Sequence, residues 1–181
     1  MTLATVWNHR LEGTGTTVRA LTHADDDLIY EFQAQHPEYF GHFQDHPVTR
    51  REAVQDVEDV PLNATADQKA YLGVFDHDRL VLIVDLIIDY PLPSLVWLGL
   101  WLPDKQLSRA QQGELYQSLV QTLLTVDAVQ LQLSVFMGDR DAPTFWTDQG
   151  LTQVQRTTVV RGSRSANVTI YQDKFDTRTA N

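Results

Sequence analysis

The sequence predicts one α/β domain in which helices cover both faces of a mixed, mostly antiparallel sheet. Its 181 residues have the length of a single domain and no linker divides them, so residues 1–181 are treated as one unit. Segments with strand and helix periodicity follow the order β-α-α-β-β-β-α-β-α-β-β. Two predicted strands, residues 80–89 and 95–102, are apolar on both faces, which indicates that helices lie on both sides of the sheet.

The N-terminal part contains one predicted strand and two predicted helices. Residues 16–21 alternate and are rich in β-branched side chains, which is typical of a strand. The acidic residues 25–27 suit the N-terminus of the helix that follows. In the second helix Thr49 is the expected N-cap, with Glu52 as its capping-box partner. This helix is expected to run to Pro61 and to bury three valines, Val54, Val57 and Val60.

An antiparallel meander follows, with strands predicted at residues 70–75, 80–89 and 95–102. A helix with leucines at core spacing then leads to an alternating strand at residues 129–137. Because a helix joins the third meander strand to this one, the two strands are expected to be parallel. The chain closes with a helix at residues 142–149, a strand at 154–160, a turn at 161–165 and a strand at 167–175.

The composition excludes several classes of protein. Apolar residues make up 43% and charged residues 21%, which are values of a folded globular chain. A net charge of −10 offers no electrostatic attraction to duplex DNA or an anionic membrane, so neither is expected as a partner. The absence of cysteine excludes disulfides, thiolate catalysis and cysteine-ligated metals. No stretch is long and apolar enough for a signal peptide or a membrane span, so we expect a cytoplasmic protein.

The segment of residues 103–113 is the strongest candidate for a binding site, because it leaves a buried strand and opens a helix. A helix N-terminus presents unpaired N–H groups and the positive end of a dipole, which suits a phosphate group. Ser108, Arg109, Gln111 and Gln112 add donors, and Gly113 allows a close backbone approach. The alternative is an ordinary polar loop between a strand and a helix.

Together with the order of elements, three local strings resemble the GNAT superfamily of acyl-CoA-dependent N-acyltransferases over residues 16–175. They are Val96-Trp-Leu-Gly-Leu-Trp-Leu, Leu72-Gly-Val-Phe-Asp, and Asp139-Arg-Asp-Ala-Pro-Thr-Phe-Trp-Thr-Asp-Gln-Gly-Leu. The last is similar to the family's N-x-x-A-x-x-F-Y-x-x-x-G-F signature. The resemblance implies that acyl-CoA lies between the fourth and fifth strands, which splay apart, and that backbone N–H groups near residues 100–102 stabilise the oxyanion.

The resemblance also assigns a set of cofactor-binding residues. They are Leu100, Trp101, Leu102, Ser108, Arg109, Ala110, Gln111, Gln112, Gly113, Glu114, Asp139, Ala142, Phe145 and Trp146. With Gly113 as the last glycine of the family's R/Q-x-x-G-x-G/A loop, Ser108 takes the first position and Gln111 the middle one. A Cβ at that middle position crowds a pyrophosphate. Trp146 stands where the family often has the tyrosine that protonates the CoA thiolate, and Asp139 stands where it has asparagine.

An amine acceptor must lose a proton before it attacks a thioester, which calls for a base or for water leading to one. Asp85 and Asp89, on the long strand beside the fourth strand, are the candidates. Asp85 lies in an apolar run, where desolvation favours the protonated form. The alternative for both is a structural or solvent-facing carboxylate. Trp97 and Trp101, four residues apart on a strand, are expected to share one face, as core residues or as a pocket wall.

Three histidines, His36, His42 and His46, are close in sequence. Their alternatives are a solvated loop, a substrate-side role, or a metal site that Pro37, Gly41 and Pro47 disfavour by interrupting a helix. We expect no metal. The resulting hypothesis is an N-acetyltransferase that moves the acetyl group of acetyl-CoA to a primary amine of a small molecule or peptide, in a chain that can form a homodimer. The alternatives are a non-catalytic GNAT-like CoA-binding or regulatory module and a structural oligomerisation domain.

Overall fold

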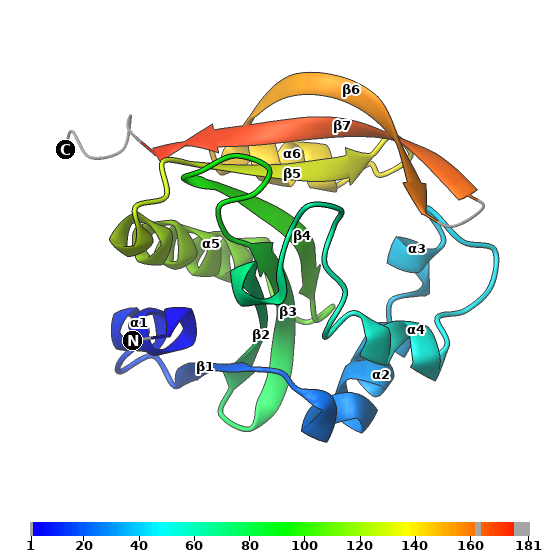
Figure 1. Ribbon diagram of the computed structural model, residues 1–181. Helices are drawn as coiled ribbons and strands as arrows, with labels where there is room; N and C mark the ends of the chain where they lie inside the picture. Colours follow the sequence, from blue (N-terminus) through cyan, green and yellow to red (C-terminus); the bar gives the residue numbers. More distant parts are fainter. Residues whose placement is uncertain (1, 162–163, 176–181) are drawn as a thin grey trace.

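In the computed structural model, which describes residues 2–161 and 164–175, a seven-stranded mixed sheet has the order β1-β2-β3-β4-β5-β7-β6 (Figure 1). The strands are β1 (Thr16–Ala20), β2 (Lys69–Asp76), β3 (Arg79–Ile87), β4 (Leu95–Pro103), β5 (Gln130–Phe136), β6 (Thr152–Arg161) and β7 (Arg164–Lys174). The α-helices are α1 (Leu3–Arg10), α2 (Asp26–Ala34), α3 (Pro37–Phe40), α4 (Arg50–Gln55), α5 (Arg109–Leu123) and α6 (Ala142–Asp148). This arrangement confirms the predicted fold class. Two residues of the predicted turn at 161–165, residues 162 and 163, lie outside the described residues.

Strand pairing confirms the predicted parallel pair at the centre of the sheet. β4 pairs with β5 in parallel, and every other neighbouring pair among the described strands is antiparallel. The parallel ladder is short, because only residues 95–98 of β4 pair with residues 130–133 of β5. Beyond it the two strands diverge. Figure 1 shows β5, β7 and β6 running across the view while β2 and β3 run nearly down it.

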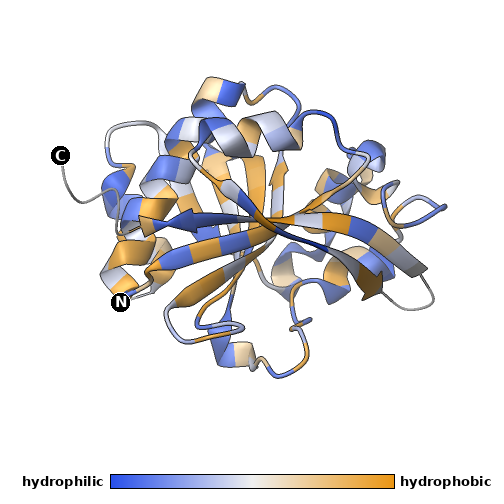
Figure 2. Cartoon of the chain, turned by 90° about the horizontal axis from the view of Figure 1, so that it is seen from above, coloured by the Kyte–Doolittle hydropathy of each residue, from blue (hydrophilic) through white to orange (hydrophobic). Residues whose placement is uncertain are grey.

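Helices cover both faces of the sheet, as the apolar strands predicted. α1 packs on α5 and β1 on one face, and α2 packs on α4 on the other face (Figure 1). Each face has its own cluster of buried apolar residues, and the strands between them carry most of the apolar colour in Figure 2. Leu82, Val84 and Leu86 point to the α1/α5 face, and Ile83 points to the α2/α4 face. This alternation explains why both faces of β3 read as apolar.

Helix α1 was not predicted, although it is part of the core. Thr2 caps it by accepting a hydrogen bond from the backbone N–H of Thr5 (3.2 Å). The fully buried Trp7 donates its indole N–H to Ser118 Oγ on α5 (2.7 Å). The side chain of Asn8 accepts from the backbone N–H of Val18 (2.7 Å), so it pairs with the edge strand β1. Contacts distant in sequence therefore hold this helix in place.

The second predicted helix is shorter than expected. Its capping box is confirmed, since Thr49 Oγ1 accepts from the N–H of Glu52 (3.3 Å) and Glu52 Oε2 accepts from the N–H of Thr49 (2.8 Å). The prediction that it runs to Pro61 is wrong, because α4 ends at Gln55 and the following residues form turns. The prediction of its buried face is also wrong in part. Ala53 is the fully buried residue, whereas the three valines are only half-buried.

Candidate active site

A β-bulge in β4 decides which side chains face the site. Asp85 pairs with Leu100 and Leu86 pairs with Leu98, so Gly99 is left without a partner on β3. Leu98 contacts the α1/α5 core, whereas Leu100, two residues later, joins the opposite core. Residues an even number of positions apart on a regular strand point to the same face, but an extra residue between them reverses this relation. The prediction that Trp97 and Trp101 share one face is therefore wrong: they point to opposite faces of the sheet, and Trp101 packs toward α5.

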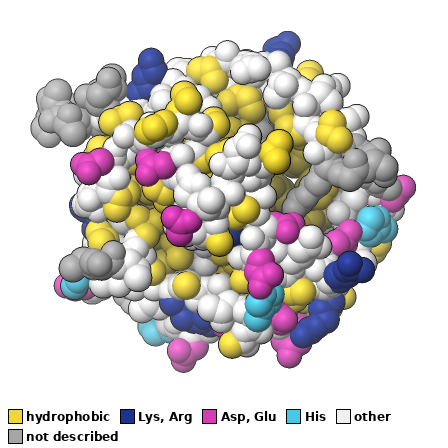
Figure 3. All heavy atoms as spheres, viewed as in Figure 1, with side chains coloured by type: hydrophobic (Ala, Val, Ile, Leu, Met, Phe, Trp, Pro, Cys, Tyr) yellow, Lys and Arg dark blue, Asp and Glu magenta, His cyan; other side chains and the backbone are white. Residues whose placement is uncertain are grey.

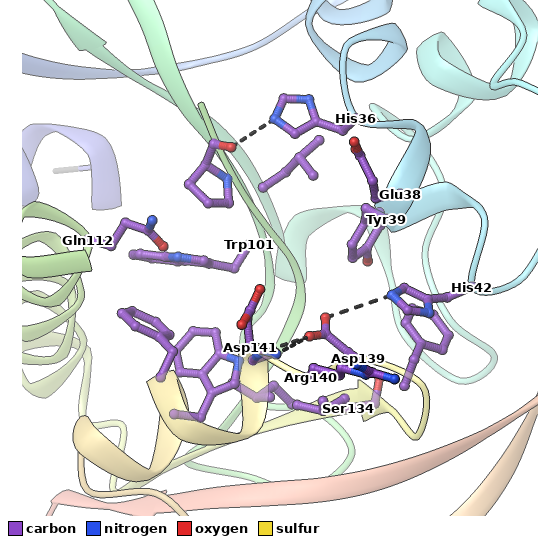
Figure 4. Close-up of a pocket in the computed structure, with 18 of the residues that line it drawn as sticks. His36, Glu38, Tyr39, His42, Trp101, Gln112, Ser134, Asp139, Arg140 and Asp141 are labelled. Atoms are coloured by element: carbon purple, nitrogen blue, oxygen red, sulfur yellow. Dashed lines mark hydrogen bonds and ion pairs between the residues drawn. The ribbon is translucent and has the colours of Figure 1, made fainter. Parts of the chain in front are cut away.

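A cavity of about 700 Å³ opens where β4 and β5 diverge. Its walls come from β4 and the start of α5 on one side, from α3 on another, and from the end of β5 with α6 on the third. Figure 4 shows side chains from these elements converging on the same space. The labelled lining residues are His36, Glu38, Tyr39, His42, Trp101, Gln112, Ser134, Asp139, Arg140 and Asp141. The cavity thus combines charged groups of both signs with aromatic rings.

Three aromatic rings pack together between β4 and the helices, and two of them, Trp101 and Trp146, line the cavity. Trp101 meets Tyr116 and Trp146 edge-on, with ring centroids 6.0 and 5.8 Å apart, and Tyr116 and Trp146 are 5.3 Å apart. The indole Nε1 of Trp101 is buried and, among the described residues, has no hydrogen-bond partner. An indole N–H is a donor only. An unpaired donor at the wall of a cavity fits a ligand that brings a carbonyl group.

The start of α5 forms another part of the cavity wall. Ser108 is the N-cap: its Oγ accepts from the N–H of Gln111 (3.2 Å), and Gln111 Oε1 accepts from the N–H of Ser108 (2.9 Å). Gln111, at the middle position of the predicted loop, therefore takes part in the capping box of α5. The guanidinium of Arg109 lies over the ring of Phe145 (5.9 Å) and lines the cavity. A Cβ at Gly113 would lie 3.0 Å from Gln149 Nε2, so the close approach that this glycine permits is to α6.

The segment around α3 closes the cavity from the other face of the sheet. Both ring nitrogens of the buried His36 lie 2.8 Å from carbonyl oxygens, Nδ1 from Phe32 and Nε2 from Pro103 at the end of β4. This side chain therefore ties α3 to β4. Glu38 and Lys105 form an ion pair (3.2 Å) at the exposed rim. The backbone N–H of Glu38 itself and the Lys105 ammonium lower the pKa of the Glu38 carboxyl.

His42 and Asp139 lie next to each other on one side of the cavity. Asp139 Oδ1 accepts from the backbone N–H groups of Asp141 and Ala142, both at 2.9 Å, at the start of α6. Its other oxygen, Oδ2, lies 3.9 Å from His42 Nε2 (Figure 4). The imidazole ring of His42 stacks on Phe136 (5.3 Å, 16°). Both side chains stay partly accessible, with 24% and 26% of their surface exposed.

The structure gathers about half of the predicted cofactor-binding residues around this cavity. Those that line it are Trp101, Leu102, Arg109, Gln112, Asp139, Ala142, Phe145 and Trp146. Those that do not are Leu100, Ser108, Ala110, Gln111, Gly113 and Glu114. Tyr39 and Ser134 also line it, although the sequence did not single them out. The signals that the sequence offers for them are that Tyr39 precedes His42 by three positions and that Ser134 lies near the end of the alternating strand.

Neither carboxylate that the sequence nominated as a base lines the cavity. Asp85 accepts two hydrogen bonds from the buried Lys69 ammonium, at 2.8 and 2.9 Å, and lies behind Gly99. Asp89 lies beyond the end of β3 that is remote from the cavity, where its Oδ1 accepts from the N–H of Ser94 (2.7 Å). Its backbone is left-handed, with a φ of 55°. Both contacts are those of structural carboxylates.

Comparison with solved structures identifies this architecture. An acetyltransferase from Thermus thermophilus matches with a TM-score of 0.66 and 19% identity, over 88% of this chain and 96% of that one. The fold is that of the GNAT acetyltransferases. The ribosomal L7/L12 α-N-protein acetyltransferase RimL in complex with coenzyme A shares this GNAT fold, with a TM-score of 0.69, 12% identity, and 89% and 94% of the two chains covered.

A further GNAT-fold match is the ribosomal-protein-S18-alanine N-acetyltransferase from Escherichia coli, with a TM-score of 0.62, 11% identity, and 88% and 94% of the chains covered. No protein-family model matches the chain. No curated protein sequence matches it. Within the described part of the chain, no helix has the length and apolar character needed to cross a bilayer. Among the same residues, no group of three or more acidic or histidine side chains is arranged to hold a metal ion.

Proposed function

We propose that this protein is an N-acetyltransferase that moves the acetyl group of acetyl-CoA to a primary amine, by direct attack within a ternary complex. The observation that carries the proposal is the cavity between the diverging ends of β4 and β5, in a chain with the GNAT fold. Similar structures include proteins named as N-acetyltransferases of ribosomal proteins, so a peptide α-amine is a reasonable acceptor to test alongside small amines.

The residues around the cavity fit acetyl-CoA in three respects. Beyond Leu98, the edge of β4 that faces β5 has no strand partner, so its backbone groups can pair with an extended amide-containing chain such as pantetheine. The buried Nε1 of Trp101 lacks a partner that a ligand carbonyl would supply. Arg109 offers a cation at the N-terminus of α5, where phosphate groups are favoured. We infer that these three groups hold the cofactor.

The same groups account for catalysis by positioning and by stabilising charge. N–H groups of residues 100–102 that point toward β5 would donate to the thioester oxygen as it becomes negative. The rings of Trp101 and Trp146, which line the cavity and pack on Tyr116, exclude water from that side and strengthen such interactions. Acidic side chains are spread over the face seen in Figure 3 and do not gather in one patch. Together with the net charge of −10, they favour a cationic acceptor.

The first test is a thermal-shift titration with acetyl-CoA, with ADP as the control for non-specific nucleotide binding. A ligand at a hundred times its Kd adds about 2.7 kcal/mol of stability, which corresponds to a rise in Tm of roughly 5–11 °C for a chain of this size. The variant Arg109→Ala should weaken acetyl-CoA binding about tenfold. The matched control Arg156→Ala, an exposed position on β6, should not. No shift at millimolar acetyl-CoA refutes the proposal.

One observation favours a second candidate, a non-catalytic CoA-binding or regulatory module. The capping box of Ser108 and Gln111 already satisfies N–H groups at the start of α5, and a side chain stands where the family's loop has glycine. The variant Gln111→Gly distinguishes the two. Tighter acetyl-CoA binding with amine-dependent release of CoA thiol supports the enzyme. Tighter binding without any release, tested over a panel of amines, supports the module.

A further inference from the structure

We propose that His42 and Asp139 together form the amine-binding site, in which Asp139 binds the substrate ammonium group and His42 accepts its proton. This inference rests on the proposed function. It assigns the acceptor class, a cationic primary amine, and names two groups that touch it. Neither residue was nominated as a base from the sequence, and the two come from elements far apart in the chain.

The distance between the two groups is suited to one bridging nitrogen. His42 Nε2 and Asp139 Oδ2 are 3.9 Å apart, which is about 1 Å too far for a direct hydrogen bond. A nitrogen that donates to both at about 2.8 Å spans this gap. An ammonium group has three donors and can make both contacts at once. The arrangement therefore suits a bound amine better than it suits a structural ion pair.

The surroundings hold both groups in place. Asp139 cannot swing freely, because its other oxygen is fixed by two backbone N–H groups at the start of α6. The ring of His42 stacks face-on against Phe136, so only its edge is presented to the cavity. Catalytic groups fixed in this way lose little entropy when a substrate binds. The buried His36 fixes the segment that carries His42 to the end of β4.

The charges around the pair are balanced. The other titratable or charged groups that line the cavity are His36, Glu38 and Tyr39 from the α3 segment, Asp104, Lys105 and Arg109 from the β4–α5 region, and Arg140 and Asp141 before α6. Lys105 is paired with Glu38 at the rim. A carboxylate beside an imidazole attracts a cationic amine and stabilises the imidazolium that forms when the proton is transferred.

An R–NH3⁺ group gives one proton to neutral His42, and the lone pair of the resulting R–NH2 forms the C–N bond to the thioester carbonyl carbon. The C–S bond breaks, and the departing CoA thiolate receives the second proton of the attacking nitrogen. His42 then returns its proton to solvent. The products are the N-acetylated amine and the CoA thiol, and no metal or redox partner is needed.

The test compares the wild-type protein with His42→Gln, Asp139→Asn and the control His9→Gln, an exposed histidine on α1. Asparagine keeps an oxygen that accepts from the backbone N–H groups of Asp141 and Ala142, so Asp139→Asn removes the charge without removing these two hydrogen bonds. Calorimetry measures acetyl-CoA binding. Release of CoA thiol is followed with spermidine, tyramine and an alanine-initiated peptide as amines, from pH 6 to 9. Urea unfolding checks that each variant folds, and His42→Asn is the second variant if His42→Gln does not.

We expect His42→Gln to lower kcat by a factor of 10²–10⁴ with acetyl-CoA binding unchanged. Asp139→Asn should raise KM for the amine about tenfold, and His9→Gln should behave as wild type. A kcat for His42→Gln within threefold of wild type overturns the inference. So does a wild-type protein that binds acetyl-CoA but acetylates none of the three amines.

A binding measurement separates failure of this inference from failure of the proposed function. The imidazole NMR signal of His42, identified by its absence in His42→Gln, should shift on addition of spermidine to the wild-type protein and shift less in Asp139→Asn. If calorimetry shows no acetyl-CoA binding, the proposed function fails, and this titration still decides whether amines bind at His42. An unshifted signal with acetyl-CoA bound overturns the amine site alone.

Discussion

The partly buried ion pair between Lys69 and Asp85 provides the sharpest test of how this fold is held together. Lys69 Nζ lies 2.8 and 2.9 Å from the two oxygens of Asp85 and 2.7 Å from the carbonyl oxygen of Asp59. The Lys69 side chain is 6% exposed and that of Asp85 is 19% exposed. The variant Lys69→Met keeps most of the apolar stem but removes the ammonium. It leaves the partly exposed Asp85 carboxylate without the Lys69 ammonium.

The expected loss of stability follows from that burial. Breaking a fully buried pair costs about 3–5 kcal/mol, and because water reaches part of Asp85 we expect about 2–4 kcal/mol for Lys69→Met. Asp85→Asn should cost a similar amount, since it leaves the ammonium without its anion. The double variant should lose less than the sum of the two, by at least about 1 kcal/mol, because either single change already removes the contact between Lys69 and Asp85.

Urea unfolding with linear extrapolation measures all four proteins, with an unchanged m-value as the check on two-state behaviour. If the loss of stability in the double variant equals the sum of the two single losses within about 0.5 kcal/mol, the pairing is refuted. The same proteins address the role of Asp85. If Asp85→Asn lowers the acetylation rate while stability stays at the wild-type value, Asp85 is the base that the sequence suggested, and its contact with Lys69 is secondary.

Three further predictions concern the hydrogen bonds of Asp139 before α6, the capping box of α4 and the docking of α1. Asp139→Ala should lose about 1 kcal/mol, or roughly 2–4 °C in Tm, because it removes the acceptor of the Asp141 and Ala142 N–H groups, whereas Asp139→Asn should lose much less; equal losses in thermal unfolding would exclude a stabilising role for these hydrogen bonds. Burial by itself raises the pKa of Glu52, but hydrogen bonds from Thr49 and His46 outweigh it and lower the pKa from 4.5 to about 2. The ionised Glu52 carboxylate therefore contributes fully to the free energy of unfolding above pH 4.5, and this contribution is lost as pH falls toward 2. The difference in stability between wild type and Glu52→Gln should shrink over that range in acid unfolding curves. Trp7→Ala should cost about 3–5 kcal/mol, because it empties a fully buried site and leaves Ser118 without its donor; a loss below about 1 kcal/mol in urea unfolding would show that α1 is not docked.

Local patterns in the sequence predicted most of the fold. The alternation of residues 129–137 and the apolar runs of the meander correspond to β5 and to β2, β3 and β4, and Thr49 with Glu52 marked a helix start correctly. The prediction of α4's length failed because turns with their own hydrogen bonds replaced the helix after Gln55. Helix α1 was missed because its stability comes from Trp7 on α5 and from Asn8 on β1, which are contacts between distant segments.

The candidate site was less predictable. The sequence led to the helix start at residues 108–113, and the structure places only Arg109 and Gln112 of that stretch in the cavity wall. It led to Asp85 and Asp89 as bases, and neither lines the cavity. The bulge at Gly99 could not be anticipated from spacing, because it appears only in the register between β3 and β4. That single unpaired residue reverses which face Trp101 occupies and places it in the cavity wall.

The sequence alone determined the class of fold, the mixed sheet, the parallel pair of β4 and β5, and the exclusion of cysteine chemistry, because these follow from periodicity, connection length and composition. Only the tertiary structure decided the chemistry of the site. His42 and Asp139 are 97 positions apart in the chain, and their 3.9 Å separation depends on how α3 packs beside the end of β5. Local patterns report the backbone that each segment prefers, whereas a site depends on distances between segments, which packing alone sets.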